Sequence, residues 1–282
     1  MTDRRHAARL ETDLATLASQ RNPRRRFLQL MGCMAALPLV GCARDTSASG
    51  TAGTAGTDDA DVEDDGSTEL LDTCSEIPEE TAGPYPGDGS NGANALALSG
   101  IVRSDIRASI AGASATAEGV PLTIQLTLVN PSDGCTPMAG YAVYLWHCDR
   151  EGNYSMYSAA VKSENYLRGV QESDESGSVT FTTIFPGCYA GRVPHVHFEV
   201  YPSLDAASRA GNEIATSQLA FPMDACEAVY ASDGYQASVS NLSRISFATD
   251  NVFSDGAELQ LATMSGSVED GYAARLTVGV RD

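Results

Sequence analysis

Two histidines separated by one residue are the first candidates for chemistry in this 282-residue chain. In an extended strand alternate residues project to the same face, so His195 and His197 would share one side while Val196 packs on the other. Two imidazoles on one face suit the binding of a single metal ion. A pair of exposed strand histidines is the simpler alternative, and Pro194 indicates that a strand begins at this point.

Two tyrosines accompany this pair. Tyr189 follows a Pro-Gly turn six residues before His195, and Tyr154 follows a strand-like segment and a turn. With these features the sequence resembles the intradiol ring-cleavage dioxygenase family, particularly its exported members. The resemblance spans roughly residues 74–221, and its motifs, in family order, are Thr81-Ala-Gly-Pro-Tyr85, the element from Trp146 to Tyr154, Leu167-Arg-Gly, Phe181-Thr-Thr-Ile-Phe-Pro-Gly and Arg192-x-x-His-x-His.

The resemblance implies one Fe(III) per chain, bound by Tyr154, Tyr189, His195 and His197. Tyr189 and His197 would be the axial ligands, and Tyr189 would be displaced by substrate. Such a donor set is chemically reasonable, because phenolate is a hard anionic donor and imidazole is an accepted iron ligand. A metal cation also keeps a tyrosine deprotonated. The implied reaction cleaves a catechol-type ring with O2 between its two hydroxyl-bearing carbons and gives a cis,cis-muconate-type diacid.

The same resemblance assigns further roles. Arg192 would be catalytic, stabilising negative charge that develops on the ring, with a structural salt bridge as the alternative. Gln218 and Tyr85 match substrate-pocket residues, whereas His147 is expected to be structural. Cys188 replaces a tryptophan found in exported members. No obvious cationic residue beyond Arg192 offers itself for a substrate carboxylate, which disfavours an acid such as protocatechuate.

Most of the chain after residue 96 has the two-residue period of strands. The expected strands are residues 122–128, 141–148, 178–185, 198–201, 259–262 and 274–280, the last two flanking a hairpin turn at Asp270-Gly271. Only Asp224 to Ser232 suggests a short helix. These patterns predict an all-β fold, either sandwich or barrel. Together with the resemblance they predict a β-sandwich of the intradiol dioxygenase type, with long loops and little helix, over residues 71–282.

The N-terminal residues have the features of an export signal. Paired arginines in Arg24-Arg25-Arg26-Phe27-Leu28 precede an apolar run that ends at Gly41-Cys42. This run is far shorter than the roughly 20 residues that span a bilayer, so residues 1–41 are predicted to be a twin-arginine lipoprotein signal peptide. Cys42 would be lipidated, and residues 42–70, rich in Ser, Thr and Gly and then acidic, would form a disordered tether. The protein would be lipid-anchored at the bacterial cell envelope, periplasmic or surface-facing.

The charge of the chain limits its partners. A net charge of −19 and the lack of a basic, aromatic-rich patch argue against nucleic acid. The expected partners are a small aromatic diol and O2, with membrane contact through the lipid anchor only and a possible homodimer. Two alternatives remain for function: a non-catalytic metal- or aromatic-binding surface lipoprotein on the same scaffold, and a structural adhesion module.

Five cysteines follow the tether, and none of them forms a CxxC motif, so a thiolate zinc site is not expected. In an exported protein they are candidates for disulfides. The hypothesised pairs are Cys188–Cys226 and Cys135–Cys148, which would leave Cys74 unpaired.

Overall fold

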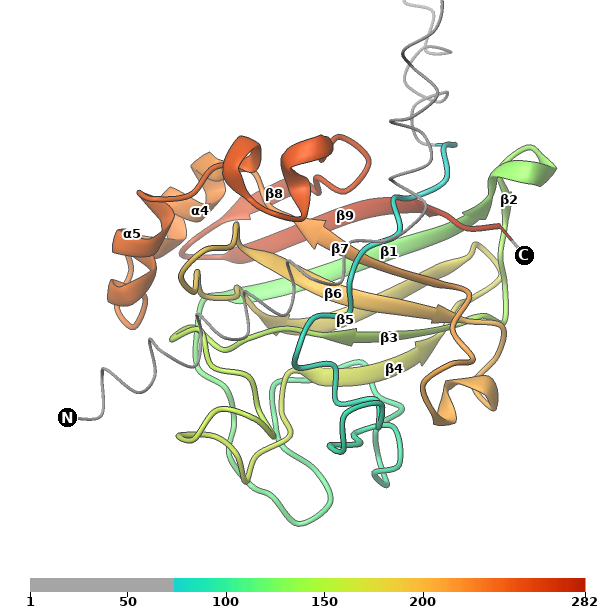
Figure 1. Ribbon diagram of the computed structural model, residues 1–282, viewed down its shortest axis with the longest axis horizontal. Helices are drawn as coiled ribbons and strands as arrows, with labels where there is room; N and C mark the ends of the chain where they lie inside the picture. The colour runs from blue at the N-terminus through green and yellow to red at the C-terminus, as the bar shows by residue number, and fades with distance from the viewer. Residues whose placement is uncertain (1–73, 282) are drawn as a thin grey trace, which may run out of the picture. The chain divides into compact units, whose positions relative to one another are not determined.

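The computed structural model of the chain describes residues 74–281, whose strands form two sheets packed face to face (Figure 1). One sheet has the order β2-β1-β9-β8, with β5 also paired to β1, and the other has the order β4-β3-β6-β7. The bounds in the first sheet are β1 (Pro121–Asn130), β2 (Thr136–Pro137), β5 (Ser178–Ile184), β8 (Thr263–Ser267) and β9 (Gly271–Gly279). In the second sheet they are β3 (Ala142–Trp146), β4 (Arg168–Glu172), β6 (His195–Tyr201) and β7 (Ala215–Ala220).

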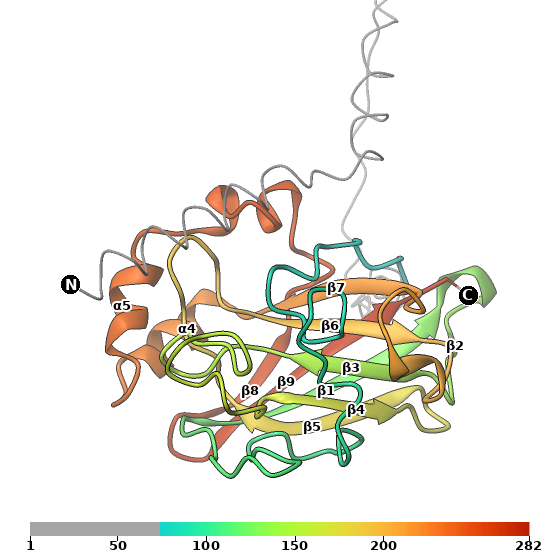
Figure 2. The same cartoon turned by 60° about the horizontal axis from the view of Figure 1, so that its bottom comes forward.

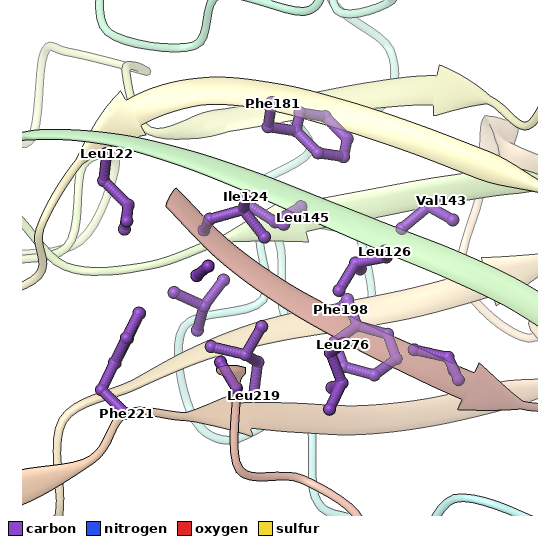
Figure 3. Close-up of a cluster of buried hydrophobic side chains, with 14 of the residues drawn as sticks. Leu122, Ile124, Leu126, Val143, Leu145, Phe181, Phe198, Leu219, Phe221 and Leu276 are labelled. Atoms are coloured by element: carbon purple, nitrogen blue, oxygen red, sulfur yellow. The ribbon is translucent and has the colours of Figure 1, made fainter. Parts of the chain in front are cut away.

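The main hydrophobic core lies between the two sheets. Along β1 the residues Leu122, Ile124 and Leu126 are buried, while the polar residues between them are partly exposed. These side chains meet Leu145 of β3 and residues of β6 and β7 in one cluster (Figure 3). Full burial of one such side chain stabilises the folded state by about 1.5–3 kcal/mol. The alternation of apolar and polar residues therefore determines which face of each strand turns inward.

The second face of the four-stranded sheet is also covered, by loops. Tyr144, Trp146 and Tyr201 of this face pack in a second cluster against residues 95–101. Every residue of β3 and β6 is therefore buried. Polar side chains on this face of β6 lie in a layer from which water is largely excluded.

Two helices lie at the end of the sheets where β6 begins (Figure 2): α4 (Met223–Tyr230) and α5 (Gln236–Leu242). The remaining helical elements in the described residues are short 3-10 turns: η1 (Pro131–Asp133), η2 (Ala206–Ser208), η3 (Phe247–Thr249) and η4 (Phe253–Asp255). Tyr230 of α4 donates a hydrogen bond to the Pro186 carbonyl (3.0 Å), and the Cys188 amide donates to Ser238 Oγ of α5 (2.9 Å). The helices thus hold the turn that precedes Tyr189.

The all-β sandwich and the helix near residue 224 are confirmed, as is the hairpin at Asp270-Gly271, which joins β8 and β9. The strand expected at residues 259–262 is wrong, because Leu261 makes only an isolated bridge to Ala220 and β8 begins at Thr263. Strands β4 and β7 were not predicted. All six residues of β7 are buried, so burial on both faces removed the alternation that would have revealed it.

Both predicted disulfides are wrong. The structure pairs Cys74 with Cys135, with Cα atoms 5.7 Å apart, and leaves Cys148, Cys188 and Cys226 as buried thiols. Six extended residues from Ala142 carry Cys148 about 20 Å away from the end of the sandwich that holds Cys135. Cys188 and Cys226 both pack as apolar side chains in the main core.

The predicted signal peptide, the tether and Cys42 lie outside the described residues. Within residues 74–281 no helix is long and apolar enough to cross a membrane.

Candidate metal centre

Strand β6 directs His195 and His197 to the loop-covered face of its sheet, and both imidazoles are almost completely buried. Their Nε2 atoms lie 3.1 Å apart. The backbone carbonyl of Val193 lies 2.6 Å from His195 Nδ1. Because a carbonyl only accepts, Nδ1 carries the proton and Nε2 keeps a free lone pair.

His197 is held in a fixed plane by its cross-strand neighbour. Trp146 of β3 is paired in register with His197. The two rings stack with centroids 4.9 Å apart and planes 3° from parallel. A Cβ at Gly83 would lie 3.4 Å from His197 Cε1, and Gly83 has a φ of +71°. This glycine allows the segment after Thr81 to turn beside the imidazole in a left-handed conformation.

Tyr189 approaches the histidines from the turn before β6. Its Oη lies 3.1 Å from His195 Nε2, and the residue is only half-buried. The turn requires Gly187, since a Cβ there would lie 2.5 Å from the Arg150 carbonyl oxygen. The Gly187 amide donates to the Asp149 carbonyl, 3.0 Å away. The turn is therefore fixed against the loop that leads to Tyr154.

Tyr154 completes the cluster from the loop after β3. Asp149 shapes this loop by accepting hydrogen bonds from the amides of Glu151 (3.0 Å) and Asn153 (2.8 Å). The tyrosine is buried, and its Oη has no hydrogen-bond partner among the described residues. An unsatisfied buried hydroxyl costs about 1–3 kcal/mol, which a cation bound to the oxygen would offset.

The four side chains fit a ferric ion. Burial lowers the pKa of His195 and of His197 well below the ordinary value, so both rings are neutral and could act as ligands. Burial also raises the pKa of Tyr154 well above its usual range and that of Tyr189 to about 12. A bound cation reverses this preference and favours the phenolates.

Carboxylates and thiols contribute nothing to this centre. Within residues 74–281 no group of three or more histidine, cysteine, aspartate and glutamate side chains is arranged to hold a metal ion. The cluster of Tyr154, Tyr189, His195 and His197 differs because half of its donors are phenol oxygens.

Arg192 is buried beside the cluster and paired with Asp250, whose oxygen lies 3.0 Å from Nε. Its Nη2 donates to Gln218 Oε1 (2.6 Å), and its Nη1 lies 3.4 Å from His195 Nε2. Gln218 Nε2 donates in turn to the Thr81 carbonyl (3.0 Å). Arg192 is therefore salt-bridged, as the structural alternative expected, and its Nη1 also lies beside the cluster. Asp250 was missed because no motif in the sequence links it to Arg192, 58 residues earlier.

Tyr85 lies against the ring of Tyr154, with centroids 5.0 Å apart. The segment that carries Tyr85 is anchored by Arg168, which is fully buried. Its guanidinium donates to the carbonyls of Tyr85 (3.0 Å) and Pro86 (2.6 Å) and to the Ser155 carbonyl (3.0 Å). One arginine thus joins the loop of Tyr85 to the loop of Tyr154.

Two other residues singled out in the sequence lie beside the cluster. His147 is buried, with Nδ1 2.7 Å from the Cys148 carbonyl and Nε2 2.7 Å from Thr183 Oγ1. Both ring nitrogens are thus used in structural hydrogen bonds. The Cys188 thiol lies 3.4 Å from the Arg192 carbonyl and packs in the core.

Comparison with known proteins identifies relatives that share part of the sequence or the fold. A family model described as Dioxygenase matches residues 104–205. Chlorocatechol 1,2-dioxygenase of Rhodococcus opacus is 32% identical over 82 residues, 25% of this chain, and the chain spans about a third (32%) of the length of this curated relative. An intradiol ring-cleavage dioxygenase from Tetranychus urticae is 26% identical, covers 74% of this chain and 95% of that chain, and superposes with a TM-score of 0.58. A second dioxygenase crystal structure, 25% identical with the same coverage, has a TM-score of 0.56. The described residues have the fold of the intradiol ring-cleavage dioxygenases.

Proposed function

We propose that this chain is an Fe(III)-dependent intradiol dioxygenase that cleaves a catechol-type ring between its two hydroxyl-bearing carbons. The observation that carries the proposal is the convergence of two imidazoles and two phenols in one buried cluster. Within it, His195 Nε2 lies 3.1 Å from both His197 Nε2 and Tyr189 Oη. The family-model match over residues 104–205 and the shared fold support the same function.

The four ligands have different freedom to move. A bound ferric ion would supply a Lewis acid and electron acceptor for the diol. His195, His197 and Tyr154 are buried and hold fixed positions, whereas Tyr189 is half-buried. Tyr189 is therefore the side chain that gives way to an incoming diol, and its phenolate oxygen can take up a hydroxyl proton as it leaves.

Iron content and colour test the metal centre. We expect the purified protein to hold one iron per chain and to show a visible band from tyrosinate-to-Fe(III) charge transfer. Tyr154→Phe and His197→Ala should lose iron. Tyr272→Phe, a partly buried tyrosine of β9 outside the cluster, should retain it. A colourless protein that binds no ferric iron on reconstitution would contradict the proposal.

Oxygen uptake tests the reaction. With catechol and ¹⁸O2, both oxygen atoms should appear in a cis,cis-muconate-type diacid measured by mass spectrometry. Tyr189→Phe should slow turnover. If iron is bound but no catechol supports oxygen uptake, the non-catalytic binding protein becomes the better assignment.

We also propose that the mature protein is exported and lipid-anchored through Cys42. The support is the sequence alone, because the paired arginines, the short apolar run and Gly41-Cys42 occur in the order of a lipoprotein signal. Wild-type protein should partition into detergent and take up labelled fatty acid, and Cys42→Ala should do neither. Sedimentation of residues 71–282 without detergent would test whether the chain forms a homodimer.

A further inference from the structure

Asp250 is a fully buried carboxylate whose oxygens are held by four N–H groups. One oxygen accepts from the amides of Val252 (2.8 Å) and Phe253 (3.2 Å), which belong to its own turn. The other accepts from the Val193 amide (2.7 Å) and from Arg192 Nε (3.0 Å). A carboxylate with this many fixed donors is rigid, and it joins segment 247–255 to the turn before β6.

The guanidinium of Arg192 is oriented from two sides. Asp250 holds Nε at 3.0 Å, and Gln218 holds Nη2 at 2.6 Å. Gln218 is itself fixed, because its amide nitrogen donates to the Thr81 carbonyl at 3.0 Å. Both polar ends of the Gln218 side chain therefore have protein partners.

The third nitrogen of Arg192 is directed at the metal centre. Among its described contacts, Nη1 lies 3.4 Å from His195 Nε2. Once that lone pair is given to a metal ion, the Nη1 N–H that points at His195 Nε2 is left to donate to another acceptor beside His195. Because Asp250 neutralises the guanidinium charge, Arg192 acts there through directed hydrogen bonds rather than through net charge.

We propose that Asp250 is a positioning residue, which together with Gln218 holds Arg192 so that Nη1 donates a hydrogen bond to an oxygen of the bound aromatic diol. This inference rests on the proposed dioxygenase function. It gives Gln218 a role in orienting Arg192 rather than in binding the diol directly.

Asp250→Asn is the first test. The asparagine keeps an oxygen for the Val252 and Phe253 amides, but its NH2 group replaces the oxygen that accepts from Arg192 Nε and from the Val193 amide. A misplacement of about 1 Å can cost about 100-fold in rate, so we expect kcat for catechol to fall about 100-fold with iron content unchanged. Asp233→Asn, an exposed carboxylate outside this network, is the matched control and should retain full activity.

A double-mutant cycle separates positioning from a purely structural role. If Asp250 acts through Arg192, then Asp250→Asn should reduce kcat by less than about threefold in an Arg192→Lys background. Independent, multiplicative losses would overturn the inference, as would wild-type kcat in Asp250→Asn.

A measurement independent of turnover distinguishes this inference from the proposed function. The Arg192 Nε–H resonance, assigned by its loss in Arg192→Lys, should exchange slowly with solvent in the full chain, with diamagnetic Ga(III) replacing any iron. In Asp250→Asn it should exchange rapidly. Fast exchange in the wild type would overturn the pairing itself, whereas slow exchange in a protein without dioxygenase activity would contradict only the reaction.

Discussion

The disulfide between Cys74 and Cys135 provides a quantitative test of how the folded domain is stabilised. It closes a loop with a sequence separation of 61 residues. Closing such a loop removes about 14 cal/mol/K of chain entropy from the unfolded state, or about 4 kcal/mol at 25 °C. We expect the Cys74→Ser/Cys135→Ser variant to lose about this amount of unfolding free energy, a large part of the roughly 5–15 kcal/mol typical of a domain.

The metal centre should be unaffected by this change. After Cys74 the chain is held near the cluster by other contacts: the Glu80 amide donates to the Thr216 carbonyl (2.8 Å), and Ser217 Oγ donates to the Pro78 carbonyl (2.7 Å). The double variant should therefore keep its iron and its visible band while it unfolds more easily. The loss of about 4 kcal/mol corresponds to a fall in Tm of about 10 °C for a domain of this size.

Guanidinium chloride titrations followed by tryptophan fluorescence give the free energy, with Trp146 as the chain's single tryptophan. Reductant should shift the wild-type transition toward that of the double variant and leave the double variant unchanged. Equal midpoints for the oxidised wild type and the double variant would refute the loop-entropy reasoning.

Three further predictions concern residues close to the centre. Gly83→Ala should weaken iron retention against a chelator, because a left-handed alanine costs roughly 1–2 kcal/mol and this strain falls on the segment that contacts His197, 3.4 Å from the new Cβ. Gly140→Ala has a similar φ of +82° with nothing within 4 Å, and should bind iron normally. Gly187→Ala should destabilise the fold by roughly 1–3 kcal/mol and displace Tyr189, because the new Cβ would lie 2.5 Å from the Arg150 carbonyl oxygen. Chemical denaturation measures the loss of stability, and visible absorbance measures the displacement of Tyr189. Burial lowers the pKa of His147 to about 4, so the unfolded chain binds this proton first as the pH falls. His147 should thus contribute up to about 3 kcal/mol to the fall in unfolding free energy between pH 6.5 and 4. The fall should be smaller by that amount in His147→Gln, as measured by urea titrations at several pH values.

The alternation of apolar and polar residues was enough to predict the strands that bury one face and expose the other. Strand β1 alternates buried aliphatic residues with polar ones, and the same period placed His195 and His197 on one face. The turn residues before Tyr189 and before β9 were equally visible, because glycine and proline mark turns by their own backbone preferences. The convergence of the four candidate donors then followed from motif order, which the resemblance supplied.

Contacts between distant segments could not be predicted in this way. Asp250 reaches Arg192 from a 3-10 turn with no recognisable motif, and Cys74 reaches Cys135 only because its segment runs beside β9. The wrong pair Cys135–Cys148 assumed that proximity in sequence means proximity in space. Strand β3 carries the chain to the other end of the sandwich between these two cysteines.

Strand register explains how an ordinary sheet assembles the centre. Pairing across the four-stranded sheet places Arg168, Trp146, His197 and Gln218 in one row. Arg168 joins the two covering loops, Trp146 fixes the plane of His197, and Gln218 orients Arg192. A slip of β6 by one residue would turn both histidines into the apolar core and bring Val196 into the cluster. The hydrophobic face and the histidine-bearing face of β6 therefore specify the same register, so the packing that stabilises the sandwich also aligns the candidate donors.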